Sequence, residues 1–96
     1  MRFEWDPRKA ASNAAKHGVT FEEATEVFAE GVIAMESDSI ENPARELRHL
    51  RVGPIKRGVV LVVWTERHAD VIRVISARFA SRVERALFHE YMRSIP

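Results

Sequence analysis

The sequence predicts an α+β fold: two N-terminal helices, a mostly antiparallel β-sheet of about four strands, and a C-terminal helix packed on that sheet. The sheet is predicted by residues 59–78, where two runs of β-branched and aromatic residues flank a polar break, Glu66 to Asp70. This pattern is typical of a β-hairpin with a loop longer than two residues. Val59 to Trp64 is apolar at every position, which predicts an interior strand covered on both faces.

The first helix is predicted by its two ends. Asp6 is suited to the N-cap and Pro7 to the first helical position, where its missing N–H costs nothing. We expect the helix to run to about Lys16 or His17, because Gly18 is a C-cap signal. Its inner face should be alanine-rich and consist of Ala10, Ala11, Ala14 and Ala15.

Capping boxes predict the other two helices, since a Glu follows a Thr or Ser by three residues. The first box, Thr20 to Glu23, opens a helix that ends at Gly31 and has its apolar face at Phe21, Ala24, Val27 and Phe28. The second box, Ser81 to Glu84, opens the C-terminal helix. Its apolar face is predicted to be Val83, Leu87 and Tyr91, extended by Ile95.

The remaining strands have weaker patterns. Arg2 to Trp5 alternates polar and apolar residues, as a short edge strand does, and Val32 to Met35 is a second candidate strand. The polar stretch Glu36 to Pro43 is typical of a loop. Arg45 to Val52 is expected to be a strand with one solvated face, and the Gly-Pro and Arg-Gly pairs within 53–58 predict a turn after it.

Length and composition restrict the class of protein. Ninety-six residues make one domain, 1–96, with a single modest core. The chain has no cysteine, no signal-peptide core and no apolar run near the ~20 residues that a bilayer needs, so we expect a cytoplasmic protein without membrane contact. No cofactor or metal site is predicted, because the chain has no nucleotide-binding loop and its histidines lack zinc-ligand spacing: His17, His49, His68 and His89.

Charge is distributed unevenly along the chain. Residues 1–44 contain four Lys or Arg and nine Asp or Glu, a net charge of −5, whereas residues 45–96 contain eleven and five, a net charge of +6. If the two halves form different surfaces, the second attracts phosphates. The alternative is that the halves interleave in space and their fields partly cancel.

Arginine dominates the basic half, in which Lys56 is the single lysine. A guanidinium grips phosphate oxygens at two points, which an ammonium does not, so this preference points to phosphate recognition. The alternative is a solvated basic face held by ion pairs. The arginines concerned are Arg45, Arg48, Arg51, Arg57, Arg67, Arg73, Arg78, Arg82 and Arg85.

Strand alternation limits which arginines can meet. Arg73 and Arg78 are five residues apart, so a regular strand places them on opposite faces unless a bulge intervenes. Arg78 and Arg82 can converge at the start of the last helix, where free N–H groups add an anion site. His49 should point away from its neighbour Arg48.

The Lys16-His17 pair is the other candidate for chemistry. Histidine titrates near neutrality, so this pair at a helix end is suited to donate a proton. The alternative is that both cations simply satisfy the last carbonyls of the helix.

Together these residues resemble the BrnT family of small bacterial toxins. The matching segments are Phe3 to Pro7 with Lys9-Ala10, Asn13, Lys16 to Ala24, Glu46 with Arg48, Trp64 to Arg67, Ile72 to Arg78, and Ala80 to Arg82 with Glu84-Arg85. The similarity spans nearly the whole chain, and the order and spacing of the motifs are more specific than any one of them.

The resemblance implies a RelE-like fold and an endoribonuclease that cleaves mRNA without a metal or cofactor. It also implies neutralisation by a BrnA-like antitoxin, a DNA-binding protein of the ribbon-helix-helix type. In such a reaction the 2′-OH of the RNA is the nucleophile, and the protein orients it, neutralises the phosphate and protonates the leaving oxygen. Arg78 and Arg82 are the expected phosphate clamp, Arg48 and Arg73 its second choices, and Lys16 or His17 the proton carrier.

Two other functions are compatible with the same residues. The arginines would serve a non-catalytic RNA- or DNA-binding module equally well. The acidic N-terminal half would serve a protein whose function is assembly with a partner.

Overall fold

The computed structural model describes residues 1–41, 46–68 and 70–96, with residues 37–41 described at the level of the backbone. In chain order the elements are β1 (Arg2–Glu4), α1 (Pro7–His17), α2 (Phe21–Ala24), the 3-10 helix η1 (Thr25–Phe28), β2 (Met35–Glu41), β3 (Leu47–Ile55), β4 (Gly58–His68), β5 (Val71–Phe79) and α3 (Arg82–Arg93).

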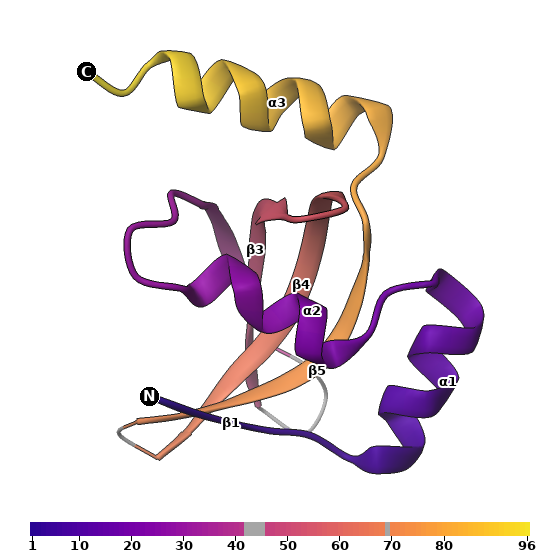
Figure 1. The fold of residues 1–96 in the computed structure, drawn as a ribbon. Helices are drawn as coiled ribbons and strands as arrows, with labels where there is room; N and C mark the ends of the chain where they lie inside the picture. The colour runs from indigo at the N-terminus through magenta and orange to yellow at the C-terminus, as the bar shows by residue number, and fades with distance from the viewer. Residues whose placement is uncertain (42–45, 69) are drawn as a thin grey trace.

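The strands form one sheet in the order β1-β5-β4-β3-β2. β1 runs parallel to β5, and the other neighbouring pairs are antiparallel. Figure 1 shows α2 in front of one face of the sheet, α1 beside β5, and α3 across the end where β3 turns into β4. The predicted α+β class is confirmed, with five strands rather than about four.

The three helix starts follow their predicted caps. Asp6 accepts hydrogen bonds from the first turn of α1, and Gly18 ends that helix with a φ of 71°. Thr20 and Ser81 each form a complete capping box with the Glu three residues later. The second helix is shorter than predicted, because it tightens into η1 and ends at Phe28 rather than at Gly31.

The core lies between the sheet and the N-terminal helices. Phe21, Val27, Val60 and Val62 are fully buried there. Along β4 the alternate residues Val59, Leu61 and Val63 are only half-buried. β4 is therefore the central strand, as predicted, and its second face is covered only in part. We call the face opposite α2 and η1 the open face.

Two predictions about the region before β3 are wrong. Residues 36–41 belong to strand β2 rather than to a loop, and of Val32 to Met35 only Met35 is in a strand. The pairing of β2 with β3 supplies backbone hydrogen bonds that outweigh the polar composition. Residues 42–45, at which the predicted loop ends and the next strand was expected to begin, lie outside the described residues.

β3 continues through the predicted Gly-Pro turn. Gly53 and Pro54 pair with Val60 and Val59, and the chain turns at Lys56 and Arg57 instead. A Cβ on Gly53 would lie 3.0 Å from the Cβ of Ala34 and 3.2 Å from that of Val27. Gly53 is thus needed for the close packing of η1 on the sheet, not for a turn.

The face that α3 turns toward the sheet is not the apolar face predicted from the sequence. Val83, Leu87 and Tyr91 of α3 are 67%, 55% and 38% exposed, whereas Phe88 is only 4% exposed. Glu84 precedes Phe88 by one helical turn and binds Arg78 of β5. These two inward contacts set the rotation of α3 about its axis and leave the apolar stripe Val83–Leu87–Tyr91 without cover from the described residues.

α1 packs through an asparagine rather than through a face of four alanines. Ala11 and Ala15 are exposed, and Asn13 is the buried residue of the helix. The Asn13 Nδ2 donates to the carbonyl of Ala77 at 2.8 Å and to that of Val19 at 3.0 Å. The N–H of Ala77 donates to the Asn13 Oδ1 at 3.1 Å. We call this set of three hydrogen bonds the Asn13 clasp.

We expect Asn13→Ala to lower the free energy of unfolding by roughly 2–4 kcal/mol, because it leaves both backbone groups of Ala77 buried without a partner. Urea denaturation measures the change. Ser12→Ala, which truncates an exposed neighbour on the same helix, is the control and should change stability by less than about 0.5 kcal/mol. Equal stability of the two variants would show that the clasp contributes nothing.

Candidate functional site

A β-bulge brings Arg73 and Arg78 to the same face of the sheet. Val63 pairs with Ser76 and Trp64 with Val74, so Ile75 is the extra residue of β5. Arg73 and Arg78 pair with Thr65 and Leu61, which are four residues apart on β4 and therefore share a face. Strand alternation alone would place Arg73 and Arg78 on opposite faces, and the bulge at Ile75 removes this restriction.

Arg48 lies on the same open face. Its neighbour His49 stacks on Trp64, with ring centroids 4.5 Å apart, on the face that η1 covers. Strand alternation directs Arg48 the other way, as predicted. Ser76, between Arg73 and Arg78 on β5, also belongs to the open face because it pairs with Val63. This face therefore carries Arg48, Arg73 and Arg78 from two strands, with the hydroxyl of Ser76 between the last two.

Each of these three arginines has a carboxylate partner. Arg73 binds Glu4 at 2.7 Å, and Arg67 approaches the same carboxylate oxygen at 3.6 Å. Arg48 lies 3.2 Å from Glu46. These pairs hold the guanidiniums in place, and they also reduce the positive charge that a phosphate would meet.

The pair of Arg78 with Glu84 has the best geometry. The two Nη atoms donate to the two Oε atoms, each at 2.8 Å. These hydrogen bonds lower the pKa of Glu84 to about 2, although its partial burial acts in the opposite direction. They also raise the pKa of Arg78. The guanidinium has five N–H groups, so some remain for a second acceptor.

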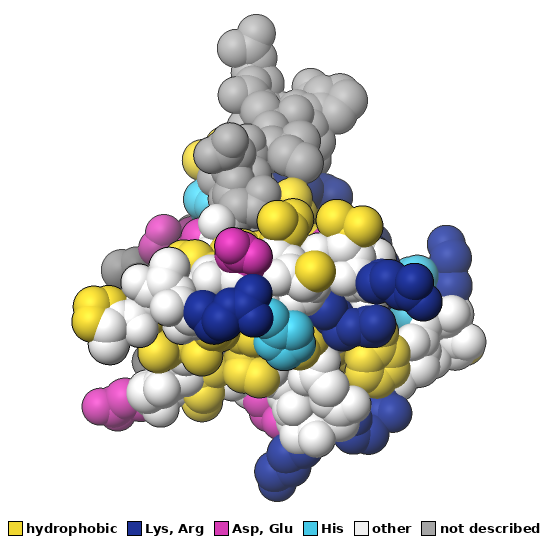
Figure 2. Space-filling view, turned by 90° about the horizontal axis from the view of Figure 1, so that it is seen from above, with side chains coloured by type: hydrophobic (Ala, Val, Ile, Leu, Met, Phe, Trp, Pro, Cys, Tyr) yellow, Lys and Arg dark blue, Asp and Glu magenta, His cyan; other side chains and the backbone are white. Residues whose placement is uncertain are grey.

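Arg82 and Arg85 provide charge that is not neutralised in this way. Arg82 is the exposed first residue of α3 and has no ion-pair partner among residues 1–41, 46–68 and 70–96. Arg85 donates to the carbonyl of Ala80 at 3.4 Å but to no described carboxylate. Figure 2, seen from the α3 side, shows Lys and Arg side chains interleaved with hydrophobic and histidine side chains. The start of α3 is therefore cationic.

The Lys16-His17 pair lies in a hollow between α1 and β5. The hollow has a volume of about 230 Å³, and its polar lining includes Lys9, Ser12, Lys16, His17 and Ser76. Ser76 therefore borders both this hollow, which we call the α1 hollow, and the open face. Two groups of candidate residues about sixty positions apart in the sequence meet at the middle of β5.

Other arginines have structural partners. Arg57 donates to Glu23 at 2.6 and 2.9 Å and to the carbonyl of Gly18. The hydrogen bond from Arg57, followed by one from Thr20, lowers the pKa of Glu23 to about 2. Arg51 binds Glu36 at 2.8 Å. The interpretation of the arginines as ion-paired side chains thus holds for much of the set.

Lys9, Ser12 and Ser76 line the α1 hollow but were not predicted from the sequence as site residues. Lys9 lies two turns before Lys16 on the same helix, a spacing that the sequence shows. Ser76 has no such signal, because its place depends on the bulge. Within the described part of the chain, no three His, Cys, Asp or Glu residues are grouped as metal ligands are, and no helix is long and apolar enough to span a membrane.

Comparisons with known proteins identify the family and the fold of the chain. A family model described as "Ribonuclease toxin, BrnT, of type II toxin-antitoxin system" matches residues 5–84. The chain belongs to the BrnT family. The crystal structure of the Brucella abortus ribonuclease toxin BrnT superposes with a TM-score of 0.64 at 24% sequence identity, over 85% of this chain and 99% of that one.

The structural match shows that the BrnT fold is shared. The comparison with curated proteins gives no match. The resemblance noted from the sequence motifs is therefore confirmed at the level of family and fold. The RelE-like relationship and the roles of individual residues stay predictions.

The Arg78–Glu84 pair should make stability depend on pH in a defined range. Because the pKa of Glu84 falls from 4.5 to about 2 on folding, its contribution is complete above pH 4.5 and disappears as the pH falls toward about 2. We expect Glu84→Gln to melt below the wild type at pH 7, with a difference that shrinks across this range. Calorimetry at several pH values measures it, and a constant difference would contradict the pairing.

Proposed function

We propose that this BrnT-family protein is a metal-independent endoribonuclease that cleaves mRNA and arrests growth, and that a BrnA-like antitoxin neutralises it. Membership of a family of ribonuclease toxins supports the reaction class. The observation that carries the proposal is the arrangement around Ser76, where the α1 hollow borders an open face that carries Arg73 and Arg78.

Metal-free RNA cleavage needs three functions from the protein. The 2′-OH must lose its proton and attack the adjacent phosphorus, the growing charge must be stabilised, and the departing 5′ oxygen must receive a proton. In our proposal Arg78 and Arg82 stabilise the phosphate, with Arg73 and Arg48 as further contacts. Lys16 or His17 in the α1 hollow moves the proton, and the products are a 2′,3′-cyclic phosphate and a 5′-OH.

The carboxylate partners fit this proposal as positioning groups. Glu84 holds the Arg78 guanidinium in a fixed plane, so less side-chain entropy is lost when a phosphate binds. Arg82 and Arg85 supply the uncompensated charge that attracts the RNA to the start of α3. Lys9 and Lys16 supply it at the α1 hollow, where neither has a carboxylate partner among the described residues.

We expect the purified protein to cleave RNA in the presence of EDTA and to leave 2′,3′-cyclic phosphate ends. Arg78→Ala should reduce the rate by about 100-fold or more, as the loss of a transition-state charge contact does. His17→Ala and Lys16→Ala identify the proton carrier, since its loss should also change the pH profile. Gel electrophoresis and end-group analysis of the fragments measure these effects.

Arg93→Ala is the matched control, because Arg93 is an exposed arginine at the far end of α3 whose one ion pair with a described residue is to Glu90. It should leave the rate unchanged. Intact RNA that binds the folded protein in a salt-dependent manner would instead support the non-catalytic binding module. Growth arrest on induction of the wild type, but not of Arg78→Ala, tests the toxin function in cells.

The partner in this proposal is a BrnA-like ribbon-helix-helix antitoxin that binds operator DNA while bound to the toxin. A type II system includes a protein antitoxin, which supports a protein partner. The stripe Val83–Leu87–Tyr91 supports it further, because a large apolar surface on a helix is a common feature of interaction sites. The assembly alternative therefore becomes part of the toxin proposal rather than a rival to it.

We expect Leu87→Asp to weaken the complex with the co-encoded antitoxin by at least tenfold, because a carboxylate replaces an apolar contact. Isothermal titration calorimetry measures the affinity. The fold should be unaffected, since Leu87 is 55% exposed, and RNA cleavage by the free variant confirms it. Unchanged affinity would place the antitoxin elsewhere on the surface.

A further inference from the structure

A second hollow lies at the other end of the sheet, away from α1. It has a volume of about 220 Å³, and its walls include Phe28, Trp64 and Ile72. The carboxylates of Glu66 and Asp70 also line it. Neither carboxylate has an ion-pair partner within the described ranges. An apolar slot with uncompensated acceptors is suited to a ligand that is flat and carries hydrogen-bond donors.

The aromatic wall of this hollow is held rigidly. Trp64 packs edge-on against Phe28 at 5.3 Å and stacks on His49 at 4.5 Å. The Arg51 guanidinium lies over the Phe28 ring at 4.8 Å and is tied to Glu36. A preformed aromatic surface lowers the entropy cost of stacking a planar ring on it.

Two donors in this wall have no acceptor. The Nε of Arg51 and the Nε1 of Trp64 are buried and make no hydrogen bond to a described residue. Buried polar groups are nearly always paired in folded proteins, so two such orphans on side chains that line one hollow need an explanation. Both N–H groups have almost no accessible surface, so a ligand in the hollow would reach them only if these side chains moved. Glu66 and Asp70 are exposed and offer accessible acceptors at the hollow.

We propose that this hollow binds a single guanine base of an RNA strand. Guanine presents adjacent donors, N1–H and the N2 amine, which match the two oxygens of a carboxylate, and it presents the acceptors O6 and N7 on another edge. Adenine and uracil lack two adjacent donors. The volume is below the roughly 300–1,000 Å³ of sites for drug-sized ligands, which suits one base rather than a larger molecule.

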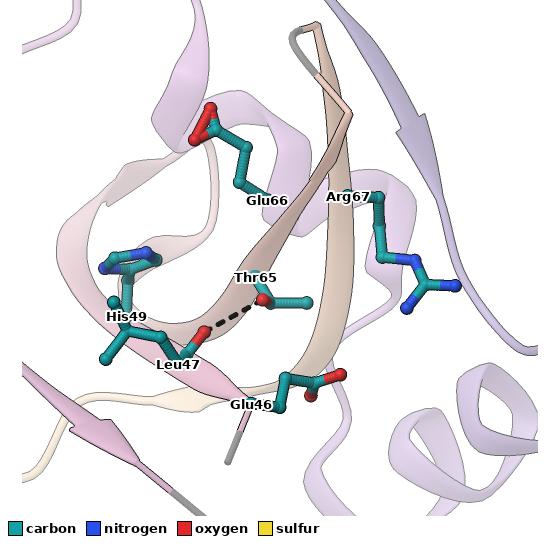
Figure 3. Close-up of a pocket in the computed structure, with 6 residues that line it drawn as sticks. All are labelled: Glu46, Leu47, His49, Thr65, Glu66 and Arg67. Carbon is teal, nitrogen blue, oxygen red and sulfur yellow. Dashed lines mark hydrogen bonds between the residues drawn. The ribbon is translucent and has the colours of Figure 1, made fainter.

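The hollow can be reached by an RNA strand bound at the open face. Glu66 lines both this hollow and a neighbouring one of about 370 Å³, whose lining includes Thr65 and Arg67. Figure 3 shows Glu66 and Arg67 projecting in different directions from the same end of β4. A strand whose phosphates follow Arg67 and Arg73 can therefore turn one base around the end of β4. This inference rests on the proposed ribonuclease function and adds the base that the site selects.

Titration of the protein with GMP, AMP, CMP and UMP tests the inference without any cleavage. We expect GMP to shift the Trp64 indole N–H resonance in ¹H–¹⁵N NMR spectra, and the other three to shift it much less. Trp64→Phe assigns this signal, because Trp5 is the only other tryptophan. Glu66→Gln and Asp70→Asn should each weaken GMP binding by about tenfold, while Glu30→Gln, an exposed carboxylate outside the hollow, should not.

A second arm separates RNA from free nucleotide. The trinucleotide UGU should compete with GMP, and UAU should not. GMP binding without competition by UGU would overturn the assignment to RNA, as would a Trp64 signal that responds to the antitoxin but to no nucleotide. Equal responses to all four nucleotides would overturn the choice of guanine.

The two proposals can fail separately. If RNA is cleaved and Glu66→Gln retains the rate but loses a preference for sites near guanine, both are supported. If GMP binds as described but no RNA is cut, the ribonuclease proposal fails and the base site remains. If RNA is cut at the same positions by the wild type and by Glu66→Gln, the base site fails and the ribonuclease proposal remains.

Discussion

The arrangement of the molecule depends on how the backbone N–H and C=O groups at the outer edge of β5 find hydrogen-bond partners. β1 pairs with β5 only from Val71 to Arg73, and beyond that point the backbone of Ala77 would be buried with unpaired polar groups. The side-chain amide of Asn13 supplies one donor and one acceptor to Ala77, as a neighbouring strand would. The same amide binds Val19 after the helix end. One side chain thus anchors α1 to the sheet, and with it the Lys16-His17 end of the helix.

Ion pairs with carboxylates determine which arginines keep an uncompensated positive charge. Within the described residues, Arg48, Arg51, Arg57, Arg73 and Arg78 each have an acidic partner. Several of these partners, including Glu4, Glu23 and Glu36, come from the acidic N-terminal half of the sequence. The two halves therefore interleave at these contacts, and the fields partly cancel there. Among the described residues, cations without such partners include Lys9 and Lys16 of α1, beside β5, and Arg82 at the start of α3. The positive charge that ion pairs leave uncompensated is concentrated on these side chains.

Local signals predicted local structure well and non-local structure poorly. Asp6, Gly18 and the two capping boxes marked helix ends correctly, because a cap is a contact between residues close in sequence. Residues 36–41 were predicted to be a loop, because their strand state depends on pairing with β3. The apolar stripe of α3 was predicted from its periodicity, but its exposure was not, because amphipathic periodicity indicates an apolar face and not whether this chain or a partner covers it. The roles of Arg78, Arg82, Lys16 and His17 were inferred from residue chemistry, and the structure adds where these side chains lie.

The sequence by itself determined the family, the α+β class, the helix caps, the central hairpin and the choice of arginine as the dominant cation, since these depend on residue type and short-range spacing. Only the tertiary structure decided which side chains share a surface. The bulge at Ile75 puts Arg73 and Arg78 on one face, and the Asn13 clasp brings the α1 hollow to Ser76. The physical reason is that strand register and helix docking are set by the pairing of buried backbone groups between distant segments, which no local pattern encodes.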